Sequence, residues 1–321
     1  MSFYVAGTGS ALPEKVVSND DLAQFLDTSD EWIVTRTGIR RRHILTHERL
    51  EELAVASAKE ALADAGIGGE EVDLILCATM RGDTVTPATA CAVAGAIGSA
   101  APAFDINAAC VGVLYCMEIA DSFIVAGKAK TVLVVSCEAM SKLVDWTDRS
   151  TCVLFGDGAG AMVLRAGEGR LAGELSTRPD LHAIRMPNIE GSSPYNTIGQ
   201  EKLALTMDGG EVYKFAVNAM GRNIEEACAQ AGLTPADIDW YLPHQANVRI
   251  ITASLKKFKI DKDKVLLNID ECGNMSATSV MVLLDQYAKK GTFHCGDKLL
   301  LVAFGGGLTS GAVIIEWKKN Q

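Results

Sequence analysis

The chain has 321 residues, of which 48% are apolar, and its 40 acidic residues outnumber 30 basic ones to leave a formal net charge of -10. This length and apolar fraction exclude a disordered or fibrous protein and suit one large domain or two of average size. The acidic balance argues against a general binder of nucleic acid or of anionic membranes, because both need a net basic face.

The N-terminal segment and the cysteine usage predict a cytoplasmic protein. MSFYVAGTGS lacks the charged-then-apolar pattern of a signal peptide, and no apolar run approaches the roughly 20 residues that a membrane span needs. The nine cysteines form no C-x-x-C pair, so most are interpreted as small buried residues in a reducing compartment. The five histidines are scattered along the chain and show no metal-ligand spacing, so no metal site is predicted.

Taken in chain order, the predicted elements occur twice, about 165 residues apart. Residues 61–80 and 227–246 each show a helix end, an Ala-Gly stop, an acidic turn and a strand. Residues 103–164 and 266–315 each predict a short strand, a tight turn, a long apolar helix, a buried strand and a Gly-rich turn into a last strand.

The repeat predicts a duplicated α/β unit. The strands are continuous apolar runs, which indicates sheets that helices cover on both faces. We therefore expect an N-terminal half at 1–168 and a C-terminal half at 169–321, packed around one core. Residues 188–200, rich in Asn, Ser, Gly and Pro, predict a surface loop.

The two copies differ at three positions that could share one site. Cys110 in the first copy corresponds to Asn274 in the second, at the turn where a helix begins, and His244 follows the strand that matches the one ending at Ala78. A pseudo-twofold arrangement would bring these turns together. Catalytic groups also gather at the carboxyl ends of α/β strands.

Each of the three residues has a chemical and a structural interpretation. A thiol before a helix N-terminus faces unpaired N–H groups that favour thiolate, but Cys110 could equally be one more buried cysteine. His244 could be a catalyst, or a capped or surface histidine. Asn274 could donate to a developing negative charge, or simply cap a helix.

A Gly-rich run at 304–311 follows a predicted strand. Its glycines allow backbone N–H groups to approach a substrate oxygen, the geometry of an oxyanion hole. No Lys-Ser/Thr pair follows, so it is not a P-loop, and residues 7–10 lack the third glycine of a dinucleotide site. The matching run at 155–161 is interpreted as a structural turn.

These segments resemble a known family. The resemblance lies in DTSDEWIVTRTGI (27–39), NAAC (107–110), FGDGAG (155–160), PHQAN (243–247) and GN (273–274). In the same order along essentially the whole chain, they resemble β-ketoacyl-acyl-carrier-protein synthase III, the initiating condensing enzyme of type II fatty acid synthesis. The resemblance implies a thiolase-like fold with α-β-α-β-α layers, two similar five-stranded sheets and a homodimer.

The resemblance also implies roles for particular residues. The family's Cys-His-Asn triad corresponds to Cys110, His244 and Asn274, and its backbone oxyanion hole to Cys110 and Gly306. The implied reaction condenses an acyl-CoA primer with malonyl-acyl carrier protein, with no cofactor beyond the coenzyme A thioester substrate. The implied coenzyme A contacts are Trp32, Arg36, Arg149, Gly209 and Asn247.

Without the resemblance, residues 28–31 read as a capping box, Trp32 as core and Arg36 as a solvated side chain. Thr86 stands where acetyl-restricted members often carry a bulky aromatic residue, which suggests a roomier acyl pocket. The basic residues Arg249, Lys256 and Lys257, with Lys259, are usually a solvated face, but they match positions where the family docks its acidic carrier protein.

Two alternatives stay open at this point. A condensing enzyme or acyltransferase of secondary metabolism could keep the same triad on the same scaffold. A non-catalytic acyl-binding protein is the alternative from another class, although the intact triad counts against it. A non-decarboxylating thiolase is less favoured, since the stretch 305–311 holds no second cysteine.

Overall fold

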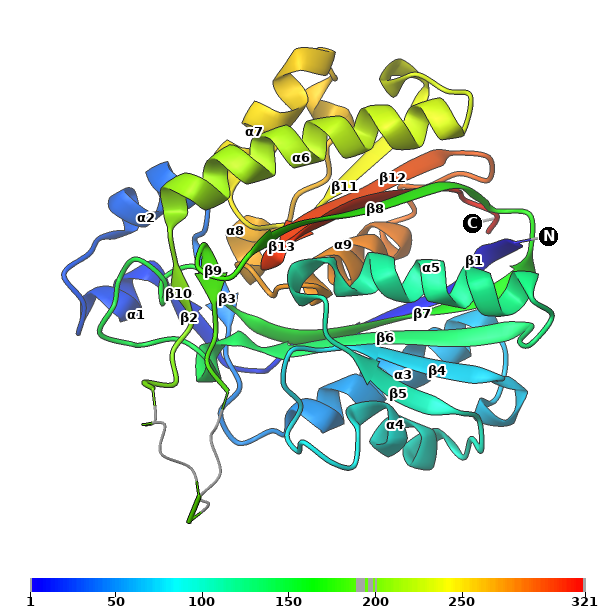
Figure 1. The fold of residues 1–321 in the computed structure, drawn as a ribbon, viewed down its shortest axis with the longest axis horizontal. Coiled ribbons are helices and arrows are strands. Elements are labelled where there is room, and N and C mark those ends of the chain that lie inside the picture. The colour runs from blue at the N-terminus through cyan, green and yellow to red at the C-terminus, as the bar shows by residue number, and fades with distance from the viewer. Residues whose placement is uncertain (1, 189–193, 196–198, 200, 320–321) are drawn as a thin grey trace.

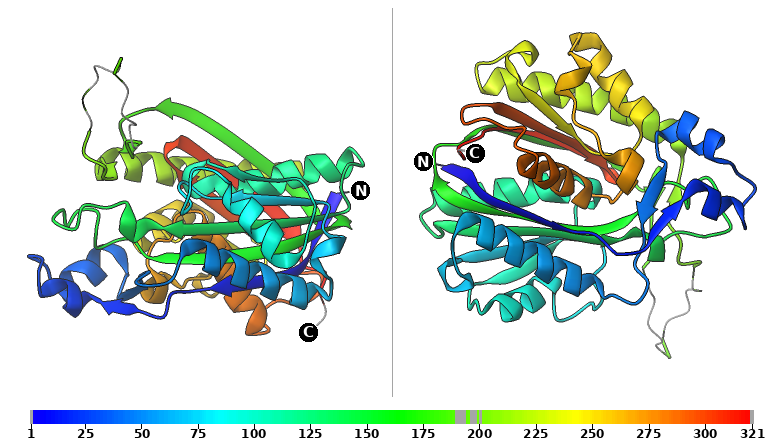
Figure 2. Two further views of the ribbon diagram at one scale, coloured as in Figure 1. Left: turned by 90° about the horizontal axis from the view of Figure 1, so that it is seen from below. Right: turned by 180° about the vertical axis from the view of Figure 1, so that it is seen from behind.

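The computed structural model describes residues 2–188, 194–195, 199 and 201–319, and these stack in five layers (Figure 1). Two sheets alternate with three layers of helices, so the expected α-β-α-β-α order is confirmed. Both termini lie at the same end of the stack (Figures 1 and 2). Most of the predicted loop at 188–200 lies outside the described residues.

The first sheet uses only the N-terminal part of the chain. Its strand order is β1-β7-β6-β4-β5, with β4 parallel to β5 and β6, and β7 antiparallel to β1 and β6. All nine residues of β6 are buried, as expected for a strand with helices on both faces. The strands are β1 (Ser2–Ala11), β4 (Leu74–Ala78), β5 (Ala103–Ile106), β6 (Thr131–Ala139) and β7 (Asp157–Gly167).

The second sheet repeats this arrangement with one strand fewer. Its order is β11-β12-β13-β8, with β11 parallel to β12 and the other neighbours antiparallel. The expectation of five strands is wrong for the described residues, because the fifth position is reduced to one parallel bridge between Tyr241 and Val265. The strands are β8 (Arg170–Asp180), β11 (Trp240–Pro243), β12 (Lys298–Gly305) and β13 (Gly307–Glu316).

Three pairs of helices form the helical layers. The middle pair packs between the sheets in the largest apolar cluster, where Leu114 and Val280 meet strand residues such as Val134 and Leu301. The other two pairs cover the outer sheet faces in separate clusters. The pairs are α3 (Leu50–Ala65) with α4 (Thr89–Ile97), α5 (Gly112–Val125) with α9 (Thr278–Lys289), and α6 (Gly209–Gln230) with α7 (Val248–Leu255).

Short elements gather at the end of the stack away from the termini (Figure 1). They are β2 (Val16–Ser18), α1 (Asn19–Ala23), α2 (Asp30–Thr37), β3 (Arg41–His43), β9 (Ile184–Arg185), β10 (Thr206–Met207) and α8 (Ile269–Cys272). Leu22 and Ile33 from these segments share a further apolar cluster with Val153 and with Leu205, which directly precedes β10. Within the described ranges, no helix has the length and apolar character that crossing a membrane requires.

Candidate active site

A mostly apolar pocket lies where the two halves meet. Its free space is about 150 Å³, comparable to cavities that hold a molecule of benzene size. Residues of both halves line it, so neither half builds the pocket alone. The lining includes Cys110, His244 and Asn274, together with Gly209, Asn247, Phe304, Gly305 and Gly306.

Cys110 lies in a tight turn between β5 and α5. A 3₁₀ turn at Ala109–Val111 leads directly into the helix. Ala109 has φ +47°, a left-handed conformation that is uncommon for a residue with a side chain. The thiol therefore sits at the expected helix N-terminus, and the chain conformation that places it there is strained.

The environment of the Cys110 thiol opposes ionisation. Burial is the largest influence and raises its pKa to about 11, although a hydrogen bond from Ser276 lowers the pKa; the nearby Glu138 also contributes to the rise. The Ser276 hydroxyl donates to Cys110 Sγ at 3.4 Å. Burial thus outweighs the thiolate preference expected from the helix end alone.

His244 follows β11 and is buried at the pocket wall. Its backbone N–H donates to Val302 O at 2.8 Å, which extends the β11–β12 pairing by one residue. The ring packs edge-on against Phe304 at a centroid distance of 5.6 Å. Burial lowers the pKa of His244 to about 3, so the imidazole is neutral and one ring nitrogen carries a proton to donate.

Asn274 has its amide orientation set by its neighbours. Its backbone N–H donates to Leu154 O at 2.9 Å and its carbonyl accepts from Gly156 N–H at 3.0 Å. The side-chain Oδ1 accepts from the backbone N–H of Ser276 at 2.9 Å. Because the oxygen is used in this way, the amide NH₂ is the group left to donate within the pocket.

The Gly-rich turn between β12 and β13 packs directly on the turn that carries Cys110. A Cβ at Gly305 would lie 2.8 Å from Cys110 N and 3.1 Å from Cys110 Cβ. Only glycine permits this approach. At Gly306 the nearest atoms to a Cβ would be 3.6 Å away, on Ala109 and Ile184.

The residues expected at coenzyme A divide into two groups. Gly209 and Asn247 line the pocket, whereas Trp32, Arg36 and Arg149 form a cluster outside its lining. The Arg36 and Arg149 guanidinium carbons lie 4.5 Å and 5.3 Å from the Trp32 ring centroid. Asn247 connects the groups, because its Nδ2 donates to Arg36 O at 3.0 Å.

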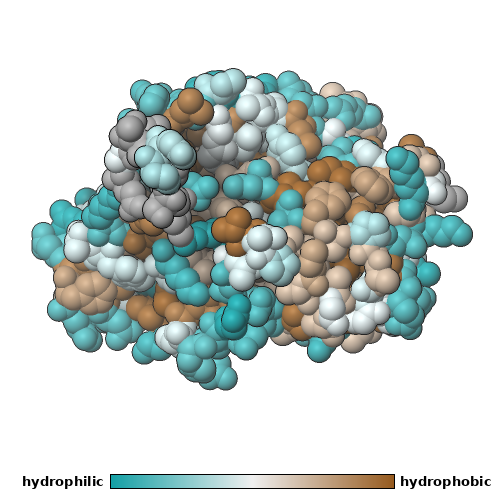
Figure 3. Space-filling view, turned by 60° about the horizontal axis from the view of Figure 1, so that its bottom comes forward, coloured by the Kyte–Doolittle hydropathy of each residue, from teal (hydrophilic) through white to brown (hydrophobic). Residues whose placement is uncertain are grey.

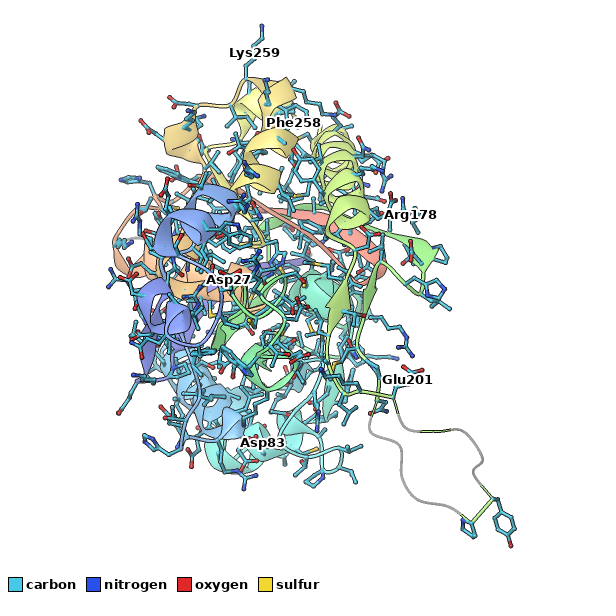
Figure 4. The ribbon with its side chains drawn as sticks, turned by 90° about the vertical axis from the view of Figure 1, so that its left-hand side faces the viewer. Asp27, Asp83, Arg178, Glu201, Phe258 and Lys259 are labelled. Carbon is cyan, nitrogen blue, oxygen red and sulfur yellow. The ribbon has the colours of Figure 1, made fainter. Side chains whose placement is uncertain are left out.

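The remaining expected residues are on the surface. Thr86 is exposed and does not line the pocket of the single chain. Arg249 on α7 and Lys256 at its end are exposed, and Lys257 forms an ion pair with Glu225 at 2.9 Å. The neighbouring Lys259 projects outward from this end of the molecule (Figure 4).

Two buried polar residues beside Cys110 were not predicted from the sequence. Ser276 touches the sulfur, and Glu138 lies buried at the end of β6. Glu138 could have been found, since it is the one charged residue in the otherwise apolar and small run TVLVVSCEA. Ser276, two residues after Asn274, carries no comparable pattern. Among the described residues, no group of three His, Cys, Asp or Glu could hold a metal ion.

A cysteine, a neutral histidine and an asparagine amide line one apolar pocket, and these are side chains that suit acyl transfer through a cysteine thioester. The chain matches the family model of 3-oxoacyl-[acyl-carrier-protein (ACP)] synthase III over residues 104–179, and the C-terminal model of that family over residues 228–317.

Relatives match along their whole length. The β-ketoacyl-[acyl-carrier-protein] synthase III of Rhodospirillum centenum is 47% identical, with 98% of each chain covered. The crystal structure of 3-oxoacyl-[acyl-carrier-protein] synthase III from Aquifex aeolicus VF5 is 43% identical with a TM-score of 0.92, covering 98% of this chain and 100% of that one. The priming β-ketosynthase of the R1128 polyketide pathway is 33% identical with a TM-score of 0.93, covering 100% and 97%.

This chain belongs to the β-ketoacyl-acyl-carrier-protein synthase III family. It is an acyltransferase of the condensing type in fatty acid biosynthesis. The family resemblance seen in the sequence is thereby confirmed.

Proposed function

We propose that this chain condenses a short acyl-CoA primer with malonyl-acyl carrier protein, giving 3-oxoacyl-acyl carrier protein, CO₂ and coenzyme A. The observation that carries the proposal is that Cys110, from one half, shares a single pocket with His244 and Asn274, from the other. A thioester on Cys110 and a donor pair facing it supply the two functions that such a condensation needs.

In the first half-reaction, the Cys110 sulfur attacks the acyl-CoA carbonyl after losing its proton. The C–S bond to coenzyme A breaks, and the coenzyme A thiolate takes up one proton, which balances the proton lost by Cys110. The backbone N–H groups of Cys110 and Gly306 are the proposed donors to the oxyanion. The close approach of Gly305 to Cys110 supports this assignment, because it brings the Gly-rich turn against the nucleophile.

In the second half-reaction, malonyl-carrier protein enters the same pocket. The neutral His244 and the Asn274 amide donate to its thioester carbonyl and stabilise the enolate formed as CO₂ leaves. The carbanion attacks the acyl group on Cys110, the C–S bond to Cys110 breaks, and the released thiolate takes up one proton from water. A neutral imidazole suits this role, because one of its ring nitrogens carries a proton that can be donated in a hydrogen bond.

The proposed coenzyme A path runs from the surface to the pocket. Trp32 would stack on the adenine, with Arg36 and Arg149 toward the nucleotide end, and Gly209 and Asn247 beside the pantetheine arm. The stacking of both guanidinium groups on Trp32 and the bond from Asn247 to Arg36 O support one continuous path. No further cofactor is proposed, since the thioester itself supplies the reactive group.

A primer longer or more branched than acetyl is proposed for the acyl pocket. Thr86 is small, and the pocket lining includes Met80, Met140 and Met207, whose unbranched side chains adapt to different shapes. Turnover should therefore persist with isobutyryl-CoA and octanoyl-CoA. A strict preference for acetyl-CoA would refute this proposal.

The carrier protein is proposed to dock on the basic surface of Arg249, Lys256 and Lys257. Arg249 and Lys256 are exposed in a protein with a net charge of -10, so they offer a local attraction to an acidic partner. Arg249→Glu should weaken carrier-dependent turnover more than acylation by acyl-CoA. An equal loss in both reactions would contradict the docking assignment.

A cytoplasmic homodimer is also proposed. The nine cysteines are all free thiols, which supports a reducing compartment. Strand β5 is at a sheet edge and exposes 38% of Phe104, and hydrophobic side chains gather on the side of the molecule that carries β5 and α5 (Figure 3). Pairing two β5 edges would cover this surface.

The test of the proposed function is CO₂ release and 3-oxoacyl product formation from malonyl-carrier protein with a panel of acyl-CoAs. Condensation with the organism's fatty acid carrier protein supports the proposal. A preference for the carrier protein of a secondary pathway would favour the alternative that the priming polyketide synthase represents. Acyl binding without covalent transfer would indicate a non-catalytic protein.

A further inference from the structure

Arg42, in the middle of the short strand β3, is a charged residue with no exposed surface. Its Nη1 donates to Val17 O at 3.3 Å and to Asn19 Oδ1 at 2.8 Å, and its Nη2 donates to Val153 O at 2.7 Å. These three acceptors are neutral oxygens, which offset the cost of burying a charge less fully than a carboxylate does. The position of Arg42 therefore calls for an explanation in terms of what its partners hold.

Asn19, the side-chain partner of Arg42, connects the two ends of α2. Its Nδ2 donates to Asp30 Oδ1 at 2.8 Å, and Asp30 is the first residue of the helix. The same Nδ2 donates to Ile39 O at 2.7 Å, directly after the Gly38 that caps the helix C-terminus. A flipped amide would turn its oxygen toward these two oxygens and its NH₂ toward the guanidinium, so Arg42 fixes the orientation of Asn19.

The other side of the Arg42 guanidinium reaches one wall of the active site. Its acceptor Val153 directly precedes Leu154 and Phe155, which both line the pocket. Val153 is itself buried, so this bond lies in the interior of the protein. Arg42 thus connects the pocket wall, through Asn19, with α2.

Helix α2 carries two of the residues proposed for the nucleotide end of coenzyme A, Trp32 and Arg36. The Arg36 guanidinium carbon lies 4.5 Å from the Trp32 ring centroid. The helix has eight residues, of which only Ile33 and Thr37 are buried, so apolar packing anchors a narrow face of it. So short a helix has little stability of its own. The hydrogen bonds at its ends therefore help to determine where Trp32 and Arg36 lie.

We propose that Arg42 and Asn19 are positioning residues for coenzyme A recognition, which hold Trp32 and Arg36 where the nucleotide binds. Both side chains are buried, so they act through α2 and not by contact with the substrate. They take part in no bond-forming step. This inference rests on the proposed coenzyme A path and deepens it, because it assigns the buried charge of Arg42 to recognition of the nucleotide.

Two other roles for Arg42 lead to different results. If Arg42 only stabilised the fold, its loss would lower activity with every acyl donor alike. If its charge only attracted the coenzyme A phosphates, the removal of Asn19 would leave nucleotide recognition unchanged, because Arg42 would still be present. The positioning role predicts that the loss of either residue weakens nucleotide recognition and preserves activity with a donor that lacks the nucleotide.

The experiment measures the second-order rate constant for acetylation of Cys110 by acetyl-CoA and by acetyl-pantetheine, which has the same thioester and pantetheine arm but no nucleotide. The ratio of the two constants is the nucleotide preference. The variants are Arg42→Met, Asn19→Ala and the matched control Arg41→Met. Arg41 is the neighbouring arginine on β3, but its side chain is 50% exposed and forms an ion pair with Glu271 at 3.1 Å.

Arg42→Met and Asn19→Ala should each lower the nucleotide preference by about tenfold, since each removes hydrogen bonds of buried groups. Acetylation by acetyl-pantetheine should change by less than about threefold, which also shows that the variants are folded around an intact Cys110. Arg41→Met should keep the preference of the wild type. An equal fall in Arg41→Met would overturn the positioning role, because loss of a positive charge would then explain the result.

A second variant keeps the inference testable if Arg42→Met fails to fold. Asn19→Ala changes no charge and removes a smaller side chain. A wild-type nucleotide preference in folded Asn19→Ala would overturn the positioning role, and so would an equal loss of rate with both donors.

The proposed coenzyme A path fails in a different way. Trp32→Ala should lower the nucleotide preference at least as much as the other variants. A wild-type preference near one, or a wild-type preference in Trp32→Ala, would refute the path and the inference with it. A preference that is lost in Trp32→Ala but kept in Arg42→Met and Asn19→Ala would refute the positioning role alone.

Discussion

Cys110 and Asn274 occupy matching turns in the two halves of the molecule, each followed by a helix of the central layer. Each is preceded by a residue with positive φ, Ala109 at +47° and Gly273 at +65°. Matching turns thus present a thiol from one half and an amide from the other. The two copies of the duplicated unit therefore carry chemically different side chains at the same position.

The ends of β4 and β11, which match each other in the two halves, also differ. Ala78 ends β4, and a Cβ on Gly112 would lie only 3.0 Å from the Ala78 Cβ. In the first half, this position is therefore filled by the start of α5. The matching residue in the second half is His244, whose ring lines the pocket. The first half is therefore packed at a position where the second half faces the pocket, and the pocket needs residues of both halves.

The largest expected effect comes from removing the donors of the second half. His244→Ala and Asn274→Ala should each slow condensation by about 10²- to 10³-fold, the cost of losing one oxyanion donor. Acylation of Cys110 by acyl-CoA should change far less, because the proposed donors in that step are the backbone N–H groups of Cys110 and Gly306. Separate rate measurements of the two half-reactions check this, and an equal loss in both would break the division of tasks.

The contact between the halves at Gly305 comes next. Gly305→Ala forces a Cβ to 2.8 Å from Cys110 N and should slow acylation by about 10²-fold through displacement of the nucleophile. Gly306→Ala is the matched control, because its Cβ would meet ordinary contacts of 3.6 Å. Acylation rates test the pair. Equal rates in the two variants would show that the turn does not position Cys110.

The positive-φ residues test whether the two turns are equivalent in energy. Gly273 has φ +65° and ψ -161°, a region essentially restricted to glycine, so Gly273→Ala should lower the free energy of unfolding by about 1 to 3 kcal/mol. Ala109→Gly should change it by less than about 1 kcal/mol, because relief of strain offsets the extra freedom of the unfolded chain. Urea denaturation measures the free energy of unfolding of both variants. Equal destabilisation by the two substitutions would contradict the difference in backbone conformation between the two turns.

A smaller effect per pH unit is expected from His244. Its pKa falls to about 3 in the folded protein, whereas the unfolded chain binds a proton near pH 6.5. Below pH 6.5 the unfolded state therefore binds more protons, and stability should fall by about 1.4 kcal/mol per pH unit relative to His244→Gln. Stability measured at pH 6.5, 5.5 and 4.5 tests this, and parallel curves would refute a neutral buried histidine.

The sequence allowed much of this architecture to be predicted, because periodicity and repetition are local properties. The duplication predicted that Cys110, His244 and Asn274 would meet, and they line one pocket. The missing fifth strand of the second sheet was not predictable, since the reduction to a bridge at Val265 depends on pairing geometry. The raised pKa of Cys110 also escaped prediction, because burial by distant segments outweighs the local helix end.

Intact-protein mass spectrometry after incubation with acetyl-CoA tests most directly whether the two halves build one site around Cys110. The expected result is a single acetyl adduct in the wild type that maps to Cys110, disappears on addition of malonyl-carrier protein, and is absent in Cys110→Ala. An adduct that survives in Cys110→Ala would contradict the assignment of the nucleophile and of the shared site.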